Sequence, residues 1–132
     1  MPEFVNPDGW AKPKGYNNGV ILEGSRSLFV AGQVAWDEKC QMVGEGDFAV
    51  QFKQVLGNIR AIVEKAGGSV ENIGRLTIYV KDKNAYMKAI KQVGENYREV
   101  FGKHYPAMAL VQVADLLEEG ALLEIEAQAV LK

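Results

Sequence analysis

Two carboxylates near the C-terminus are the clearest candidates for chemistry. Glu124 and Glu126 alternate with apolar residues in the run LLEIEAQAV. In an extended strand they lie on one face, about 7 Å apart. A half-buried carboxylate is partly desolvated and can hold or activate a water molecule, as a hydrolase requires. Ion pairs with Arg75 or Lys81 would explain the same residues without catalysis, and the spacing does not separate the two interpretations.

The other reactive side chains allow few combinations. His104 is the only histidine and Cys40 the only cysteine, so no catalytic triad can form unless His104 takes part. His104 stands near the end of a predicted helix, where the helix dipole favours a cation, and this structural role is preferred. A single cysteine excludes an internal disulfide and a cysteine-based zinc site. No metal-ligand cluster or phosphate-binding loop is present, so we expect no metal site.

The segment Ala31-Gly32-Gln33 follows the apolar run LFV. A glycine at a strand end permits a bulge or a close approach of the backbone to a ligand, although an ordinary strand end is the simpler interpretation. Tyr16 and Trp36 are aromatic residues near turns. Each could line a pocket or pack in the core.

The elements that position these residues follow from the hydrophobic pattern. Apolar residues recur at helical spacing over 47–66, with Asp47 as N-cap and two glycines at the end. A second helix is predicted over 84–101. Residues 1–18 hold three of the four prolines and indicate an extended arm. Strands are predicted as a hairpin within 19–35, turning at Glu23-Gly24-Ser25, and at 76–80, about 108–114 and 122–130.

The resulting order, β-β-α-β-α-β-β, predicts a single α+β domain over residues 1–132, with two helices on one face of a mixed sheet. The other face would be exposed in a monomer. Its mixture of apolar and charged residues is typical of a subunit interface, so we expect a homo-oligomer. In the strand after Pro106 we expect one face to pack in the core, with Ala109, Val111 and Val113, and the other to point outward, with Met108, Leu110 and Gln112.

Composition sets limits on partners and location. The 132 residues are 48% hydrophobic and 24% charged, with a formal net charge of −2. This balance disfavours nucleic acid as the main partner, because phosphate binding needs a concentrated positive field. We find no signal peptide or membrane-length apolar run, and the single cysteine fits a reducing compartment. We therefore expect a cytoplasmic protein.

Five segments together carry a resemblance: LFVAGQVAWD, FKQVLGNIRAIVEKAGGSVENI, LTIYVKD, YPAMALVQVADL and LLEIEAQAV. They resemble the Rid family, also called YjgF-like or L-PSP proteins. The resemblance runs from about Gly15 to the C-terminus. It implies a chorismate-mutase-like fold, assembled as a homotrimer with sheets inside, helices outside and ligand clefts between subunits. It also implies cofactor-independent hydrolysis of a 2-imino or enamine acid with release of ammonia. Family members have been described as ribonucleases as well.

The resemblance assigns roles to three residues and shows one replacement. The family glutamate that positions water falls on Glu124. The tyrosine of the N-terminal arm falls on Tyr16, and the glycine whose backbone faces the ligand falls on Gly32. The serine before that glycine is replaced by Ala31.

Three further positions depart from the family pattern. Gly94 replaces an asparagine of the second helix, Leu110 replaces a frequent cysteine, and Met108 replaces the arginine that holds the substrate carboxylate. Methionine has no donor for a carboxylate, so small 2-imino acids are expected to be poor substrates. We expect a more apolar cleft, with Gln112 or backbone amides supplying polarity. The predicted function is hydrolysis of a less acidic, larger imine or enamine, and the alternatives are a non-catalytic ligand binder or a ribonuclease.

Overall fold

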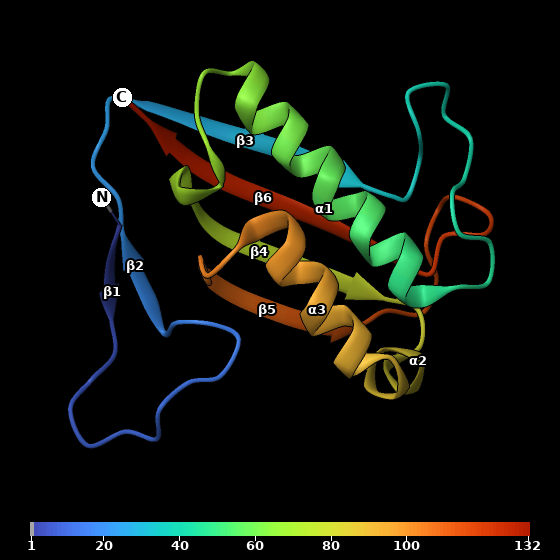
Figure 1. Cartoon of the computed structure of the whole chain (residues 1–132), viewed down its shortest axis with the longest axis horizontal. Coiled ribbons are helices and arrows are strands. Elements are labelled where there is room, and N and C mark those ends of the chain that lie inside the picture. Colours follow the sequence, from blue (N-terminus) through green and yellow to red (C-terminus); the bar gives the residue numbers. More distant parts are fainter. Residues whose placement is uncertain (1) are drawn as a thin grey trace.

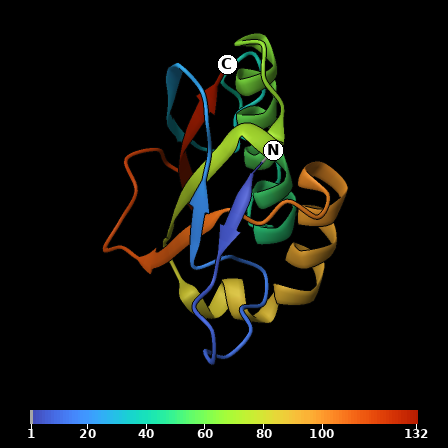
Figure 2. The same ribbon diagram turned by 90° about the vertical axis from the view of Figure 1, so that its left-hand side faces the viewer.

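The computed structural model describes residues 2–132 and places helices on one face of a four-stranded sheet (Figure 1). Figure 2 shows the opposite face of the sheet without a covering helix. The fold is therefore α+β, as predicted. In chain order the elements are β1 (Glu3–Val5), β2 (Gly19–Ile21), β3 (Arg26–Gln33), α1 (Phe48–Lys65), the 3-10 helix η1 (Val70–Asn72), β4 (Ile73–Val80), α2 (Lys83–Lys88), α3 (Ile90–Phe101), β5 (Ala107–Gln112) and β6 (Leu123–Leu131).

Helix α1 forms where the apolar stripe predicts it. The side chain of Asp47 accepts a hydrogen bond from the backbone N–H of Val50 at 3.1 Å, which caps the first turn. Gly67 follows the end of the helix with a φ of +94°, a conformation that glycine adopts without strain. The stripe of α1 packs on the sheet and buries Phe52, Val55, Leu56, Ile59 and Val63. No helix within residues 2–132 has the length and apolar composition needed to cross a membrane.

The main sheet has the strand order β3-β6-β4-β5. Strand β6 runs antiparallel to both β3 and β4, whereas β4 and β5 run parallel, so the sheet is mixed as predicted. The side chains that face the helices are buried: Leu76, Ile78 and Val80 of β4, and Leu123, Ile125, Ala127 and Ala129 of β6.

The predicted hairpin within 19–35 is wrong. Strand β2 pairs antiparallel with β1, in a separate two-stranded sheet formed with the N-terminal arm. Strand β3 pairs with β6 instead. The backbone N–H of Ser25 already donates to the carbonyl of Leu131 at 3.0 Å, so the turn delivers the chain to β6 rather than back along β2.

The predicted second helix is two helices. Helix α2 ends at Lys88 and α3 begins at Ile90, with Ala89 between them at φ −94° and ψ 6°. Alanine favours helix interiors, so the sequence carries no signal for this break.

The predicted faces of β5 are reversed. Met108 lies opposite Leu76, and Leu110 lies opposite Ile78, in the parallel pairing with β4. Because Leu76 and Ile78 face the helices, Met108 and Leu110 face them too, and both pack against the core. Ala109 and Val111 lie on the exposed face instead.

Candidate active site

Glu124 and Gly32 meet on the face of the sheet that carries no helix. The pairing of β3 with β6 steps from Val30–Ala127 to Gln33–Ile125, so β3 has one extra residue here, a β-bulge. Gly32 lies in this bulge, and a Cβ on Gly32 would overlap the carboxylate of Glu124. The absence of a side chain thus allows the Glu124 carboxylate to lie against the backbone. Ala31, the residue before, is exposed beside it.

Glu126 has a different environment from Glu124. Its carboxylate accepts a hydrogen bond from the hydroxyl of Tyr79 at 2.8 Å. This hydrogen bond, followed by desolvation and the charges of Glu126 and Glu124, raises the pKa of Tyr79 above its ordinary value. Lys81 pairs with Asp115 at 3.4 Å, so the proposed ion pair of a glutamate with Lys81 does not form within the chain.

Gln51 holds the chain that leads into Glu124. Its side chain is fully buried in α1. Nε2 donates to the carbonyls of Gly44 and Gly120, at 3.2 and 2.9 Å, while Oε1 accepts from the N–H of Leu122 at 2.9 Å. Leu122 stands two residues before Glu124, so Gln51 fixes the start of β6. This role of Gln51 was not predicted from the sequence. The only available signal was a polar residue next to the apolar stripe of the helix.

A cavity of about 280 Å³ lies on the helix side, between α2, α3, the start of β5 and the N-terminal arm. Gly94 and Met108 line it, at the positions where the resemblance expects an asparagine and an arginine. A Cβ built on Gly94 meets no atom within 4 Å, so the helix leaves open space there. Much of the remaining wall is apolar or aromatic, with Phe52, Ile78, Tyr86, Val93, Tyr97 and Tyr105.

The N-terminal arm closes one side of this cavity through Lys14 and Gly15. Asn17 holds the arm in place through two hydrogen bonds. Its Nδ2 donates to the backbone carbonyl of Tyr105 at 2.6 Å, and its backbone N–H donates to the backbone carbonyl of Pro106 at 3.3 Å. Tyr16 follows Gly15 directly, but its side chain is 41% exposed and does not line the cavity within the chain.

Leu110 and Gln112 do not point to the uncovered face as predicted. Leu110 packs against the core under the helices. Gln112 accepts a hydrogen bond from the backbone N–H of Lys83 at 2.9 Å, at the first turn of α2. Its carbonyl oxygen is therefore engaged in the fold.

His104 has a structural role, although a different one from that predicted. Its ring is buried, and Nε2 lies 2.7 Å from the carbonyl oxygen of Ile73, at the start of β4. The hydroxyl of Tyr97 donates to the backbone carbonyl of His104 at 2.6 Å. Burial raises the pKa of Tyr97 well above its ordinary value. These contacts fix the turn between α3 and β5.

The predicted site residues thus fall into two groups. Glu124, Gly32 and Ala31 lie on the uncovered face, near the β3 edge of the sheet. Met108 and Gly94 line the cavity on the helix side, next to the opposite edge strand β5. The sheet separates the two groups, so a single chain does not bring them together.

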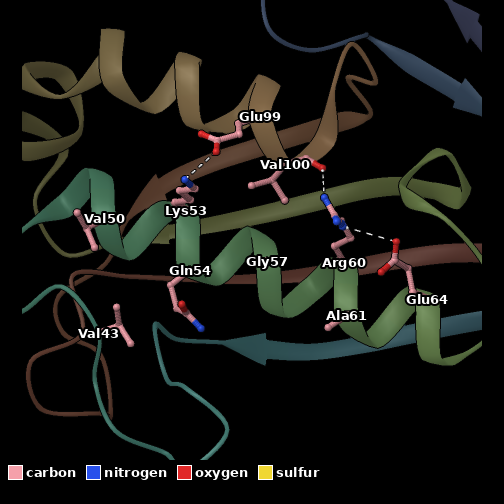
Figure 3. A pocket seen from close by; sticks show the side chains of 10 residues that line it. All are labelled: Val43, Val50, Lys53, Gln54, Gly57, Arg60, Ala61, Glu64, Glu99 and Val100. Atoms are coloured by element: carbon pink, nitrogen blue, oxygen red, sulfur yellow. Dashed lines mark hydrogen bonds and ion pairs between the residues drawn. The ribbon is translucent and has the colours of Figure 1, made fainter.

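A larger groove lies along the outer side of α1, and its charged side chains are already paired (Figure 3). Lys53 pairs with Glu99 at 3.0 Å, and Arg60 with Glu64 at 3.6 Å. Arg60 also donates to the carbonyl of Val100 at 3.3 Å. This groove offers no free cation to a ligand and is not a candidate site.

Comparison with known proteins decides the family. The model of the family described as Endoribonuclease L-PSP matches residues 11–131. A RutC family protein of Pyrococcus horikoshii is 39% identical over 127 residues, which cover 96% of each chain. The chain belongs to the L-PSP, or Rid, family. This Rid chain is also similar to the solved structure of a Rid family protein of unknown function from Yersinia pestis. The two structures match with a TM-score of 0.85 over 98% of each chain, and their sequences are 33% identical.

One relative of this Rid chain is named for its reaction. The human protein named 2-iminobutanoate/2-iminopropanoate deaminase is 31% identical over 115 residues, which cover 87% of this chain and 79% of the human protein. The resemblance seen in the sequence is confirmed at the level of the family and the α+β fold. Glu124, Gly32, Ala31, Tyr16, Met108 and Gly94 remain predictions as functional residues.

Proposed function

We propose that this Rid-family protein hydrolyses an imine or enamine and releases ammonia, in clefts between the subunits of a homotrimer. The contact between the Glu124 carboxylate and the Gly32 backbone is the observation that supports this most strongly. It gives a carboxylate held at a bulge, on a face of the sheet that no helix covers. A neighbouring subunit on that face would enclose the carboxylate and complete the cleft.

The proposed reaction needs only water and this carboxylate. Glu124 orients a water molecule and takes up its proton as the oxygen attacks the carbon of the C=N bond. Glu124 passes that proton to the substrate nitrogen, which gives a carbon bearing both a hydroxyl and an amino group. The hydroxyl proton then moves to the nitrogen as the C–N bond breaks, so ammonia leaves and the carbon becomes a carbonyl. An enamine reacts through its imine tautomer. The backbone at Gly32 contacts the reacting group, and Tyr16 of the arm closes the cleft. General acid–base catalysis of this kind contributes about 10²- to 10⁴-fold.

Ammonia release from a panel of imines and enamines tests this proposal. Glu124→Ala should lower the rate by about a hundredfold or more, because the water loses its base. Glu126→Gln is the matched control on the same strand face, and should keep the rate within a few-fold. Equal rates for wild type and Glu124→Ala would reject the role of Glu124.

The replacement of the family arginine by Met108 favours one alternative, a ligand-binding protein without turnover. Methionine cannot donate to a substrate carboxylate, so the usual way of fixing a 2-imino acid is absent. This alternative predicts that a ligand raises the melting temperature while no ammonia is released. Ammonia release that depends on Glu124 would reject it.

A further inference from the structure

We infer that Arg98, on α3, binds the carboxylate of an apolar or aromatic acid in the cavity beside Met108. Arg98 would then be a specificity-determining residue for the reaction proposed above, on which this inference rests. The substrate would keep a carboxylate, in contrast to the less acidic substrate predicted from the sequence. Arg98 on α3, and not a residue at position 108 of β5, would hold it.

Helix geometry places Arg98 over the cavity. Residues four apart lie on the same side of a helix, so Arg98 stands one turn after Gly94 and on its side. Both line the cavity, together with Met108. Gly94 leaves open space where a larger side chain would stand between Arg98 and the rest of the cavity. The loss of a side chain at 94 therefore gives the guanidinium room to reach a ligand beside Met108.

The charges around the cavity select an anion. Arg98 and Lys14 line it, and none of its described lining residues is acidic. Arg98 is exposed and forms no ion pair with any residue in the range 2–132. The cations of the groove in Figure 3, by contrast, are paired with Glu99 and Glu64. An arginine over a cavity without carboxylates is suited to a bidentate carboxylate ligand.

The walls of the cavity select an apolar body for that anion. Phe52, Ile78 and Val93 are buried, and the rings of Tyr97 and Tyr105 stack at 5.0 Å between centroids. Met108 adds a polarisable side chain that adapts to ring edges. A volume of about 280 Å³ is near the lower end of small-molecule sites, and fits an acid with one ring better than a large ligand.

Binding of phenylacetate, measured by calorimetry against its neutral isostere phenylacetamide, tests the inference on the intact protein. Wild type should bind the acid at least tenfold more tightly than the amide, as a charge-assisted pair requires. Arg98→Met keeps the apolar stem but removes the charge, so it should lower the affinity for the acid by about tenfold and leave the amide unchanged. Arg98→Lys should recover part of the loss.

Arg60→Met is the matched control, because Arg60 belongs to the paired groove on α1. It should leave both affinities unchanged. Equal binding of acid and amide by wild type, no binding of the acid, or no effect of Arg98→Met would each overturn the inference. A change of oligomeric state in Arg98→Met, seen by light scattering, would also overturn it, because Arg98 would then pair with a neighbouring subunit.

The test separates this inference from the proposed hydrolysis. Glu124→Ala should keep the preference for phenylacetate over phenylacetamide, because that preference depends on Arg98. If the acid binds through Arg98 and no imine is turned over, the inference stands and the hydrolase proposal fails. If imines are turned over through Glu124 without preference for an acid, the hydrolase proposal stands and the inference fails.

Discussion

Gly32 has no room for a side chain, because a Cβ there would overlap the carboxylate of Glu124. Gly32→Ala should therefore displace that carboxylate. We expect it to lower ammonia release strongly, but to change the free energy of unfolding by less than about 0.5 kcal/mol, because Gly32 is exposed and the Glu124 carboxylate ends a flexible side chain that can move aside. Kinetic assays and urea unfolding measure the two effects.

Gly57 provides the control for that substitution. It lies within α1, and a Cβ on it meets no atom within 4 Å. Gly57→Ala should raise the stability by about 0.5–1 kcal/mol and leave the rate unchanged. Unchanged activity in Gly32→Ala would show that the carboxylate does not need its place in the bulge.

Met108 stands where the family resemblance leads us to expect an arginine. Met108→Arg adds a second guanidinium to the cavity that Arg98 lines, and should raise the turnover of small 2-imino acids about tenfold. Met87→Arg is a suitable control, because Met87 lies exposed on α2. If wild type consumed 2-aminoacrylate as fast as Met108→Arg, an arginine at position 108 would not be needed for small 2-imino acids.

At the scale of the elements, one buried glutamine connects α1 to the strand that carries Glu124. Gln51→Leu removes the hydrogen bonds to Gly44, Gly120 and Leu122 while keeping most of the volume. Groups left without partners cost about 1–3 kcal/mol, and we expect that loss of stability in urea unfolding. Gln41→Leu, at an exposed site, should change it by less than about 0.5 kcal/mol. Equal effects would contradict the role of Gln51.

The elements also show what could be predicted from the sequence. Helix α1 was predictable because its apolar stripe and its Asp47 cap indicate the same boundaries. The partners of β2 and β3 were not predictable. The turn at Glu23-Gly24-Ser25 indicates a change of direction, but it does not indicate which strand pairs with which. The partner of β3 is β6, about 100 residues later in the chain.

The site could be predicted only in part, for a related reason. Strand β5 is apolar on both faces, so no alternation indicates which side Met108 occupies. The register with β4 decides it. Arg98 was not predicted as a binding residue, because its access to the cavity depends on the absence of a side chain at Gly94, one helical turn before.

At the scale of the whole molecule, the two halves of the proposed site lie on opposite sides of one sheet. Glu124 and Gly32 stand on the uncovered face, while Met108 and Gly94 line the cavity next to β5. The same uncovered face exposes Phe29, whose side chain is 72% exposed. Contact between this face and the β5 edge of a second chain would bury that ring and join the two halves.

Mixing two inactive variants tests this shared site most directly. Glu124→Ala lacks the carboxylate, and Gly94→Trp fills the cavity from a position where a Cβ meets open space. Each variant alone should release almost no ammonia. The two variants are unfolded and then refolded together in equal amounts, so that cyclic trimers form with mixed subunits. Each cleft has a chance of about one half of an intact Glu124 and of about one half of an intact cavity, so about a quarter of the clefts should have both. A site shared between subunits should recover about a quarter of the wild-type rate, whereas a mixture as inactive as its parts would show that the site is not shared.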